Sequence, residues 1–144
     1  MNKKELVEEV KSYLSYFRKL TEKDKKILKA IEKVDRKDFM NKNKSLAYEN
    51  EAIPIGYDQT ISQPSTVARM LSLLELNSKD RVLEIGTGSA WNAALLGHLS
   101  KEVLTLERVK KLAEKSKQKL KRLQIKNVKV MQKDFRKIKA NQKF

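Results

Sequence analysis

The stretch Arg81-Val-Leu-Glu-Ile-Gly-Thr-Gly-Ser-Ala-Trp-Asn92 decides how this chain folds. Val82, Leu83 and Ile85 form a short apolar run, which is typical of a strand buried on both faces of a parallel sheet. Gly86 and Gly88 then interrupt any regular pattern, and the segment from Ala90 to Leu99 is predicted to be a helix. The stretch therefore predicts a strand, a glycine turn and a helix, with the glycines letting a ligand approach the backbone.

The spacing of the glycines excludes two common nucleotide-binding motifs. The pattern Glu84-x-Gly86-x-Gly88-x-Ala90 departs from G-x-G-x-x-G, and the chain contains no G-x-x-x-x-G-K sequence. We still expect the first turn of the following helix to present unpaired N–H groups beside a ligand.

Three acidic residues lie where predicted strands end. Glu84 precedes the glycines, Glu107 ends the run that begins at Val103, and Asp134 follows the run from Val128 to Met131. Glu107 comes 21 residues after Gly86, the spacing at which an acid binds ribose hydroxyls in nucleotide-binding βαβ units. This arrangement describes half of an adenosine-binding sheet; the alternative is an ordinary βαβ unit with solvated acids.

Two segments resemble motifs of one enzyme family. The glycine stretch resembles motif I of the class I methyltransferases, which bind S-adenosylmethionine. Upstream, Ile53-Pro-Ile-Gly-Tyr-Asp-Gln-Thr-Ile-Ser-Gln-Pro64 resembles the signature loop of the protein-L-isoaspartate (D-aspartate) O-methyltransferase family. The two motifs occur in the family's order and at its spacing, and the resemblance runs from about Ile31 to Asp134.

The resemblance implies a fold, a reaction and a set of site residues. The fold is α/β, a Rossmann-like three-layer sandwich of which this chain has strands in the order 3-2-1, with N-terminal helices. The implied enzyme uses S-adenosyl-L-methionine to methylate the carboxylate of L-isoaspartyl residues in damaged proteins, a cytoplasmic repair reaction. Ser62 and Thr60 are the implied catalytic residues. The implied cofactor contacts are Gln59, Thr60, Ile61, Ser62, Glu84, Gly86, Thr87, Gly88, Glu107 and Asp134.

The chain is predicted to form a single, partial methyltransferase domain over residues 1–144. Residues 1–52 would hold N-terminal helices and a connection, 53–64 the signature loop, and 78–135 the cofactor-binding half-sheet. Asn2 to Glu5 is predicted to be a capping box that starts the first helix, and Thr21 to Asp24 starts the second.

Local patterns predict the connecting segments. Residues 35–52 lose periodicity and are expected to be a surface connection, and 53–62 a structured loop, because a strand does not easily run through Pro54 and Gly56. Ser62 is expected to cap the next helix, with Pro64 in its first turn. A long helix is predicted over 109–123 and a frayed tail over 135–144.

The composition of the chain excludes several kinds of functional site. The chain has no cysteine, which excludes disulfides, thiolate metal sites and cysteine nucleophiles, and no metal ligands are assigned. No apolar run approaches membrane-spanning length. The net charge is +15, and residues 101–144 hold 16 Lys/Arg against 4 Asp/Glu. A solvated helix face is favoured over a nucleic-acid site, because aromatic residues do not interleave with these lysines.

The chain departs from the family at four points. Tyr57-Asp58 replaces the family's usual pair in the signature loop, and Lys133-Asp-Phe135 replaces the usual Gly-Asp-Gly after the third strand. Ala90 stands where motif I usually has glycine, and the family continues for tens of residues beyond the point where this sequence stops. The strand at 82–85 would then be an edge open to self-association, and we expect poor catalysis by the isolated chain. The alternative is a non-catalytic or degenerate S-adenosylmethionine-binding module, with a nucleic-acid or protein partner.

Overall fold

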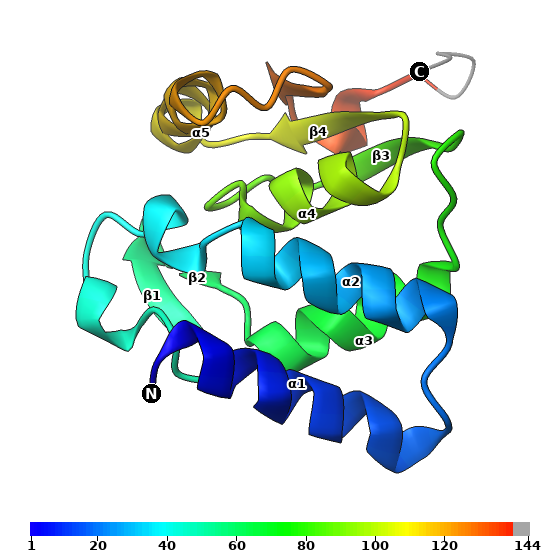
Figure 1. Cartoon of the computed structure of the whole chain (residues 1–144). Coiled ribbons are helices and arrows are strands. Elements are labelled where there is room, and N and C mark those ends of the chain that lie inside the picture. The colour runs from blue at the N-terminus through cyan, green and yellow to red at the C-terminus, as the bar shows by residue number, and fades with distance from the viewer. Residues whose placement is uncertain (140–144) are drawn as a thin grey trace. The chain divides into compact units, whose positions relative to one another are not determined.

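The computed structural model describes residues 1–139 and forms two compact units, one of residues 1–77 and one beginning at Ser78 (Figure 1). The tail predicted for 135–144 therefore lies partly outside the described residues. Its first part, Phe135–Lys137, forms the short 3₁₀ helix η3. No helix in residues 1–139 combines the length and the apolar character needed to cross a bilayer.

Three helices and a hairpin make up the first unit. The helices α1, α2 and α3 pack against one another, and two 3₁₀ helices and a two-stranded antiparallel hairpin complete the unit. The elements are α1 (Lys3–Phe17), α2 (Glu22–Lys33), η1 (Arg36–Phe39), η2 (Lys44–Leu46), β1 (Ile53–Gly56), β2 (Gln59–Ile61) and α3 (Pro64–Leu74).

Reciprocal capping boxes start the first two helices. The side chain of Asn2 accepts from the backbone of Glu5, and the Glu5 carboxylate accepts in turn from the backbone of Asn2. Thr21 and Asp24 make the same pair of bonds at the start of α2. The predicted capping box at Asn2 is confirmed, and each pair satisfies two backbone donors that a helix terminus otherwise leaves open.

The carboxylate of Asp24 also joins the three helices. Its side chain is 1% exposed and accepts hydrogen bonds from Arg18, after α1, and from the Ser72 hydroxyl of α3. Burial raises the pKa of Asp24, but hydrogen bonds from Thr21, Ser72 and Arg18 outweigh that effect and hold the pKa at about 2. An ionised aspartate therefore links all three helices of this unit at neutral pH.

The segment from 35 to 52 is not the surface connection that the sequence predicted. Arg36, Phe39, Met40 and Ala47 are all buried, and η1 and η2 lie within the segment. The polar residues between these anchors hid the pattern, because the buried positions follow 3₁₀ turns rather than a helical or strand period.

The predicted loop at 53–62 is instead a short hairpin. Pro54 pairs with Thr60 at a register irregularity, where the strands are short enough to tolerate a proline. Tyr57 and Asp58, at the tip, have φ values of 56° and 53°. Two consecutive left-handed residues suit the tight turn that joins antiparallel strands.

The predicted capping role of Ser62 is wrong. The N-cap of α3 is Gln63, whose side chain makes no capping bond, and Pro64 occupies the first turn as expected. The side chain of Asn50 accepts from the Ser65 backbone N–H at 3.0 Å and donates to the Ser65 hydroxyl at 2.7 Å. A residue 15 positions upstream therefore caps this helix.

The second unit is a parallel three-stranded sheet with two long helices. The strands β3 (Arg81–Ile85), β4 (Glu102–Glu107) and β5 (Val128–Gln132) lie in the order β3-β4-β5. The helices α4 (Trp91–Leu99) and α5 (Lys110–Arg122) connect them. The predicted strand order and parallel pairing are confirmed. Ala90, expected to be helical, is the N-cap of α4.

The two faces of this sheet differ. Right-handed crossovers place α4 and α5 on one face, where Val103, Thr105 and Val128 are buried. On the opposite face, Leu83 is 40% exposed and Ile85 is 50% exposed.

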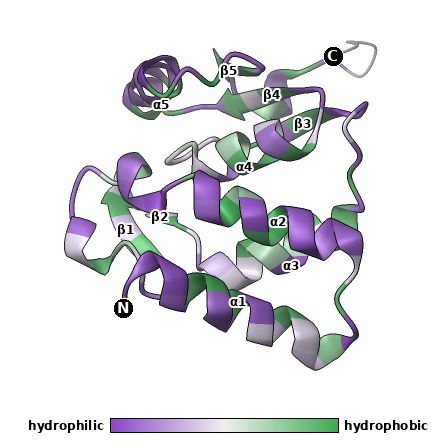
Figure 2. Cartoon of the chain, in the orientation of Figure 1, coloured by the Kyte–Doolittle hydropathy of each residue, from purple (hydrophilic) through white to green (hydrophobic). Residues whose placement is uncertain are grey.

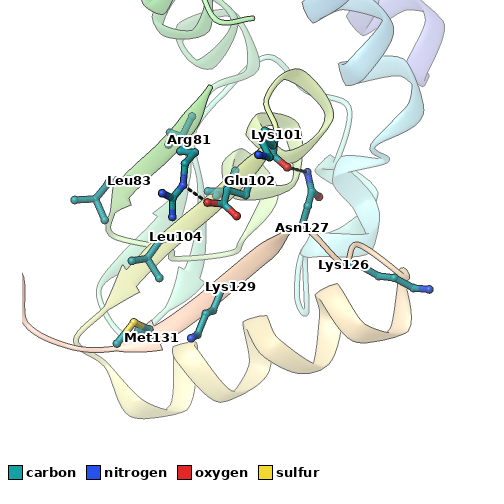
Figure 3. A pocket seen from close by; sticks show the side chains of 11 residues that line it. Arg81, Leu83, Lys101, Glu102, Leu104, Lys126, Asn127, Lys129 and Met131 are labelled. Atoms are coloured by element: carbon teal, nitrogen blue, oxygen red, sulfur yellow. Dashed lines mark hydrogen bonds and ion pairs between the residues drawn. The ribbon is translucent and has the colours of Figure 1, made fainter. Parts of the chain in front are cut away.

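A cavity of about 490 Å³ lies at the exposed face of the sheet (Figure 3). Side chains from three adjacent strands line it, among them Leu83, Leu104 and Met131. Within the described residues β3 pairs only with β4, so one edge and one face of this sheet remain uncovered in the unit.

Replacing Asp24 by asparagine is expected to lower the free energy of unfolding by about 2 kcal/mol, because the charge-assisted bonds to Arg18 and Ser72 weaken. The folded pKa of about 2 lies below the ordinary 3.8, so this contribution is complete above pH 4 and is lost as the pH falls toward 2. Urea denaturation at several pH values measures the difference. Glu22→Gln, exposed on the same helical turn, is the control and should change little.

Candidate functional site

Several backbone amides of the glycine turn between β3 and α4 already have hydrogen-bond acceptors. Gly86 and Thr87 both donate to the carbonyl of Leu106, at 2.8 and 3.2 Å. The N–H of Trp91, the first helical residue, donates to the Ser89 hydroxyl at 3.2 Å. Of the first-turn N–H groups of α4 that were expected to face a ligand, that of Trp91 is therefore already paired, as are the amides of Gly86 and Thr87 before the helix.

The glycines instead provide space. Gly86 and Gly88 have φ values of +89° and +52°, which side-chain-bearing residues rarely adopt. A Cβ built on either would find no heavy atom within 4 Å. The turn therefore has an open side where a ligand can approach the backbone at the carboxyl end of the sheet.

Glu107 lies at the end of β4 and joins two turns. One carboxylate oxygen accepts from the Gly88 N–H at 2.9 Å, and the other accepts from the Val109 N–H at 2.9 Å. A carboxylate oxygen has two acceptor positions, so with the bonds made by residues 1–139 each oxygen uses one position and has one left for a further donor. The arrangement suits a ligand with two adjacent hydroxyl groups.

Glu84 lies on β3 just before the turn, and its hydrogen bonds link β3 to β4 and to α4. Its carboxylate accepts from Thr105 on β4 at 2.6 Å and from the Asn92 side chain on α4 at 2.5 Å. Thr105 in turn shares a 2.7 Å hydrogen bond with the Thr87 hydroxyl. Burial raises the pKa of Glu84 to about 7, because bonds from Thr105 and Asn92 only partly offset the desolvation and the negative charge of Glu107 adds to it.

Two other predicted cofactor residues are already engaged. The Thr87 hydroxyl is buried in its bond to Thr105, which leaves only its backbone at the turn. Asp134 follows β5 and accepts from the backbone and guanidinium of Arg136, which lowers the pKa of Asp134 to about 2. The backbone N–H of Lys133 donates to the Glu107 carbonyl at 3.0 Å. Asp134, the next residue, therefore lies at the same carboxyl end of the sheet as Glu107.

The remaining predicted residues belong to the hairpin of the first unit. Gln59, Thr60 and Ser62 have exposed side chains, whereas Ile61 is buried in that unit. The structure thus brings Glu84, Gly86, Thr87, Gly88 and Glu107 together in one unit and Gln59 to Ser62 together in the other.

Sequence reasoning missed Thr105 and Asn92, which hold Glu84. Thr105 is a polar residue inside the apolar run Val103–Leu106, and it is fully buried. A hydroxyl in such a run must find a partner, so this interruption was a usable signal. Asn92 gave no signal, because one amide in the first turn of a helix is ordinary.

Replacing Ala90 by glycine is expected to raise the free energy of unfolding by about 0.5–1 kcal/mol. Ala90 has a φ of 70°, a conformation that glycine adopts without the steric penalty of a Cβ. Thermal or urea denaturation measures the change. The matched control is Ala93→Gly, inside α4, which should lower stability by about 1 kcal/mol or more. A loss of stability in both variants would contradict the strain at Ala90.

Replacing Glu84 by glutamine is expected to flatten the dependence of stability on pH. The folded pKa of about 7 exceeds the ordinary 4.5, so the stabilisation from protonated Glu84 is complete below pH 4.5 and is lost as the pH rises through 7. The loss is on the order of 3 kcal/mol. Denaturation at pH 5 and pH 8 measures it. Glu102→Gln, at the opposite end of β4, should retain the dependence.

Comparison with known proteins gives a consistent result. The model of the family Protein-L-isoaspartate(D-aspartate) O-methyltransferase matches residues 1–140. A protein-L-isoaspartate O-methyltransferase of Dictyoglomus turgidum is 51% identical over 107 residues, which are 74% of this chain and 49% of the relative. That of Photorhabdus laumondii is 46% identical over 120 residues, 83% of this chain and 58% of the relative.

Solved structures agree with these matches. A Plasmodium falciparum protein described as a beta-aspartate methyltransferase, in complex with S-adenosyl-L-homocysteine, has a TM-score of 0.78 at 25% identity. The similarity covers 97% of this chain and 66% of that one. This chain spans about half the length of the curated relatives it matches. The chain belongs to the protein-L-isoaspartate (D-aspartate) O-methyltransferase family.

Proposed function

We propose that this chain takes part in methylation of the carboxylate of L-isoaspartyl residues in damaged proteins, with S-adenosyl-L-methionine as the methyl donor. The observation that carries the proposal is the open glycine turn with the paired acceptor Glu107 beside it. Membership of the family, whose name states the reaction, supports the proposed substrate class. The proposed setting is protein repair in the cytoplasm.

The residues of the second unit fit an adenosyl cofactor. A ribose presents two adjacent hydroxyls, and Glu107 has one open acceptor position on each carboxylate oxygen. The open space at Gly86 and Gly88 admits a ligand close to the backbone. Glu84 stabilises the turn through its hydrogen bonds to Asn92 and Thr105, and Asp134 has a carboxylate just after β5. The Plasmodium falciparum neighbour holds S-adenosyl-L-homocysteine, which supports the same ligand class here.

The proposed chemistry needs few groups from the protein. When bound, the cofactor supplies a methyl group on a positively charged sulfur. The acceptor carboxylate has an ordinary pKa near 4 and is ionised at pH 7, so no histidine or cysteine base is required. The protein has to orient the carboxylate and exclude water. Ser62 and Thr60 are the proposed catalytic residues, and Gln59 and Ile61 complete the proposed cofactor segment.

The test is methylation of a peptide that contains an isoaspartyl residue, with the same peptide containing aspartate as the control. The full chain is expected to label only the isoaspartyl peptide, and Ser62→Ala should lower the rate. We expect slow turnover, below about 1 per second, because one face and one edge of the sheet are uncovered by the part of the unit that the structure describes. Equal labelling of both peptides, or none, would refute the proposed reaction.

A second candidate is a cofactor-binding module without catalysis. The observation in its favour is the strongly basic helix α5, which is hydrophilic over most of its length (Figure 2). Its apolar positions Leu112, Ala113 and Leu120 are buried, so the lysines make up its outer surface. Cofactor binding without methylation, together with retention of an RNA by the full chain, would favour this candidate.

Removing the carboxylate of Glu107 is expected to weaken binding of S-adenosyl-L-homocysteine by about 1–3 kcal/mol, through loss of charge-assisted hydrogen bonds. Calorimetry with Glu107→Gln measures the change, since glutamine keeps the size and one acceptor oxygen. Glu114→Gln, exposed on α5, is the control and should bind as the unchanged chain does. Unchanged affinity in a folded Glu107→Gln variant would refute the assignment.

Self-association through the edge of β3 is a further prediction. This edge carries unpaired backbone groups within the described residues, and β3 also exposes the side chains of Leu83 and Ile85 on the open face of the sheet. Light scattering should show a mass that rises with concentration, and Leu83→Lys should reduce that rise. Leu74→Lys, which removes an exposed leucine from α3, is the control. A chain that stays monomeric at every concentration would contradict the prediction.

A further inference from the structure

Arg36 is a buried cation that contacts two separate stretches of backbone. It begins η1 and is 2% exposed. One terminal nitrogen donates to the carbonyls of Ala47 and Glu49, at 3.0 and 3.1 Å. The other donates to Glu51 at 2.7 Å and to two carbonyls at the end of β2: Ser62 at 3.0 Å and Ile61 at 3.4 Å. Five carbonyls therefore converge on one guanidinium.

Burial of the Arg36 guanidinium costs desolvation free energy, which its hydrogen bonds have to offset. Desolvation lowers the pKa of Arg36 to about 10, and the side chain remains charged at neutral pH. A buried charge destabilises a protein by several kcal/mol unless hydrogen bonds satisfy it. The planar guanidinium directs its donors in fixed directions toward several acceptors, whereas a lysine offers one compact ammonium.

Two of the carbonyls that Arg36 binds lie at the end of the hairpin, next to Ser62 or in it. Ile61 ends β2 and Ser62 is the next residue, so the contacts lie at the predicted catalytic serine. The hairpin before it has only two short strands and a register irregularity. A two-stranded hairpin of this size is marginally stable by itself. The guanidinium of Arg36 therefore supplies the Ile61 and Ser62 carbonyls with hydrogen bonds from outside the hairpin.

We propose that Arg36 is the positioning residue for Ser62. By holding the carbonyls of Ile61 and Ser62 against those of Ala47, Glu49 and Glu51, it fixes the backbone from which the Ser62 hydroxyl projects. This inference rests on the proposed function for the role of Ser62 in methyl transfer. The effect of Arg36 on the Ser62 backbone does not depend on the proposed function and can be measured separately.

The absence of cysteine from the sequence allows a direct measurement. Ser62→Cys introduces a single thiol at an exposed position, and a nitroxide attached there reports local motion by electron paramagnetic resonance. Ser15→Cys, exposed on α1, provides the control label. Each label is compared in the parent chain and in Arg36→Lys. Arg36→Gln, which buries no charge, replaces Arg36→Lys if the lysine variant does not fold.

The proposal predicts that the label at 62 becomes mobile in the Arg36 variant while the label at 15 is unchanged. In the unlabelled chain, Arg36→Lys should lower kcat for the isoaspartyl peptide at least about tenfold, with a smaller change in KM. An immobile label at 62, or equal loosening of both labels, would overturn the proposal. Failure of the parent chain to methylate would refute the proposed function alone, and the label comparison would still decide the role of Arg36.

Discussion

The carboxylate of Glu107 fixes the geometry on which the candidate site depends. Parallel strands end at the same edge of a sheet, so the turns after β3 and β4 are neighbours by topology alone. Topology does not set their conformation. Glu107 does so by accepting from Gly88 in one turn and Val109 in the other, while the Leu106 carbonyl receives Gly86 and Thr87. The same residue that retains open acceptor positions thus also shapes the open turn beside it.

The sequence predicted the second unit more completely than the first. Short apolar runs, alternating helices and an acid at a fixed distance from the glycines are local signals, and they were sufficient for the strand order and for the position of Glu107. The bracing of Glu84 by Asn92 was not predictable, since it depends on how α4 packs. The conformation of Ala90 was hidden because alanine normally favours a helix.

Long-range polar contacts explain why the first unit was predicted less well. Asn50 caps a helix that begins 14 residues later, and Arg36 binds carbonyls that are up to 26 residues away along the chain. Neither contact follows from a period or a neighbouring residue. The hairpin was interpreted as a loop for the same reason: its strands are too short to show alternation, and Pro54 and Gly56 obscure them. Long-range hydrogen bonds from polar side chains, rather than apolar patterning, organise this part of the unit.

We propose that the open turn and Glu107 together form a binding site for an adenosyl cofactor. A residue-resolved NMR titration of the full chain with S-adenosyl-L-homocysteine tests it most directly. We expect saturable shifts of the backbone amides of Gly86, Thr87, Gly88 and Val109, because these lie at the turns that Glu107 joins. Absence of saturable shifts, or shifts confined to residues away from these turns, would contradict it.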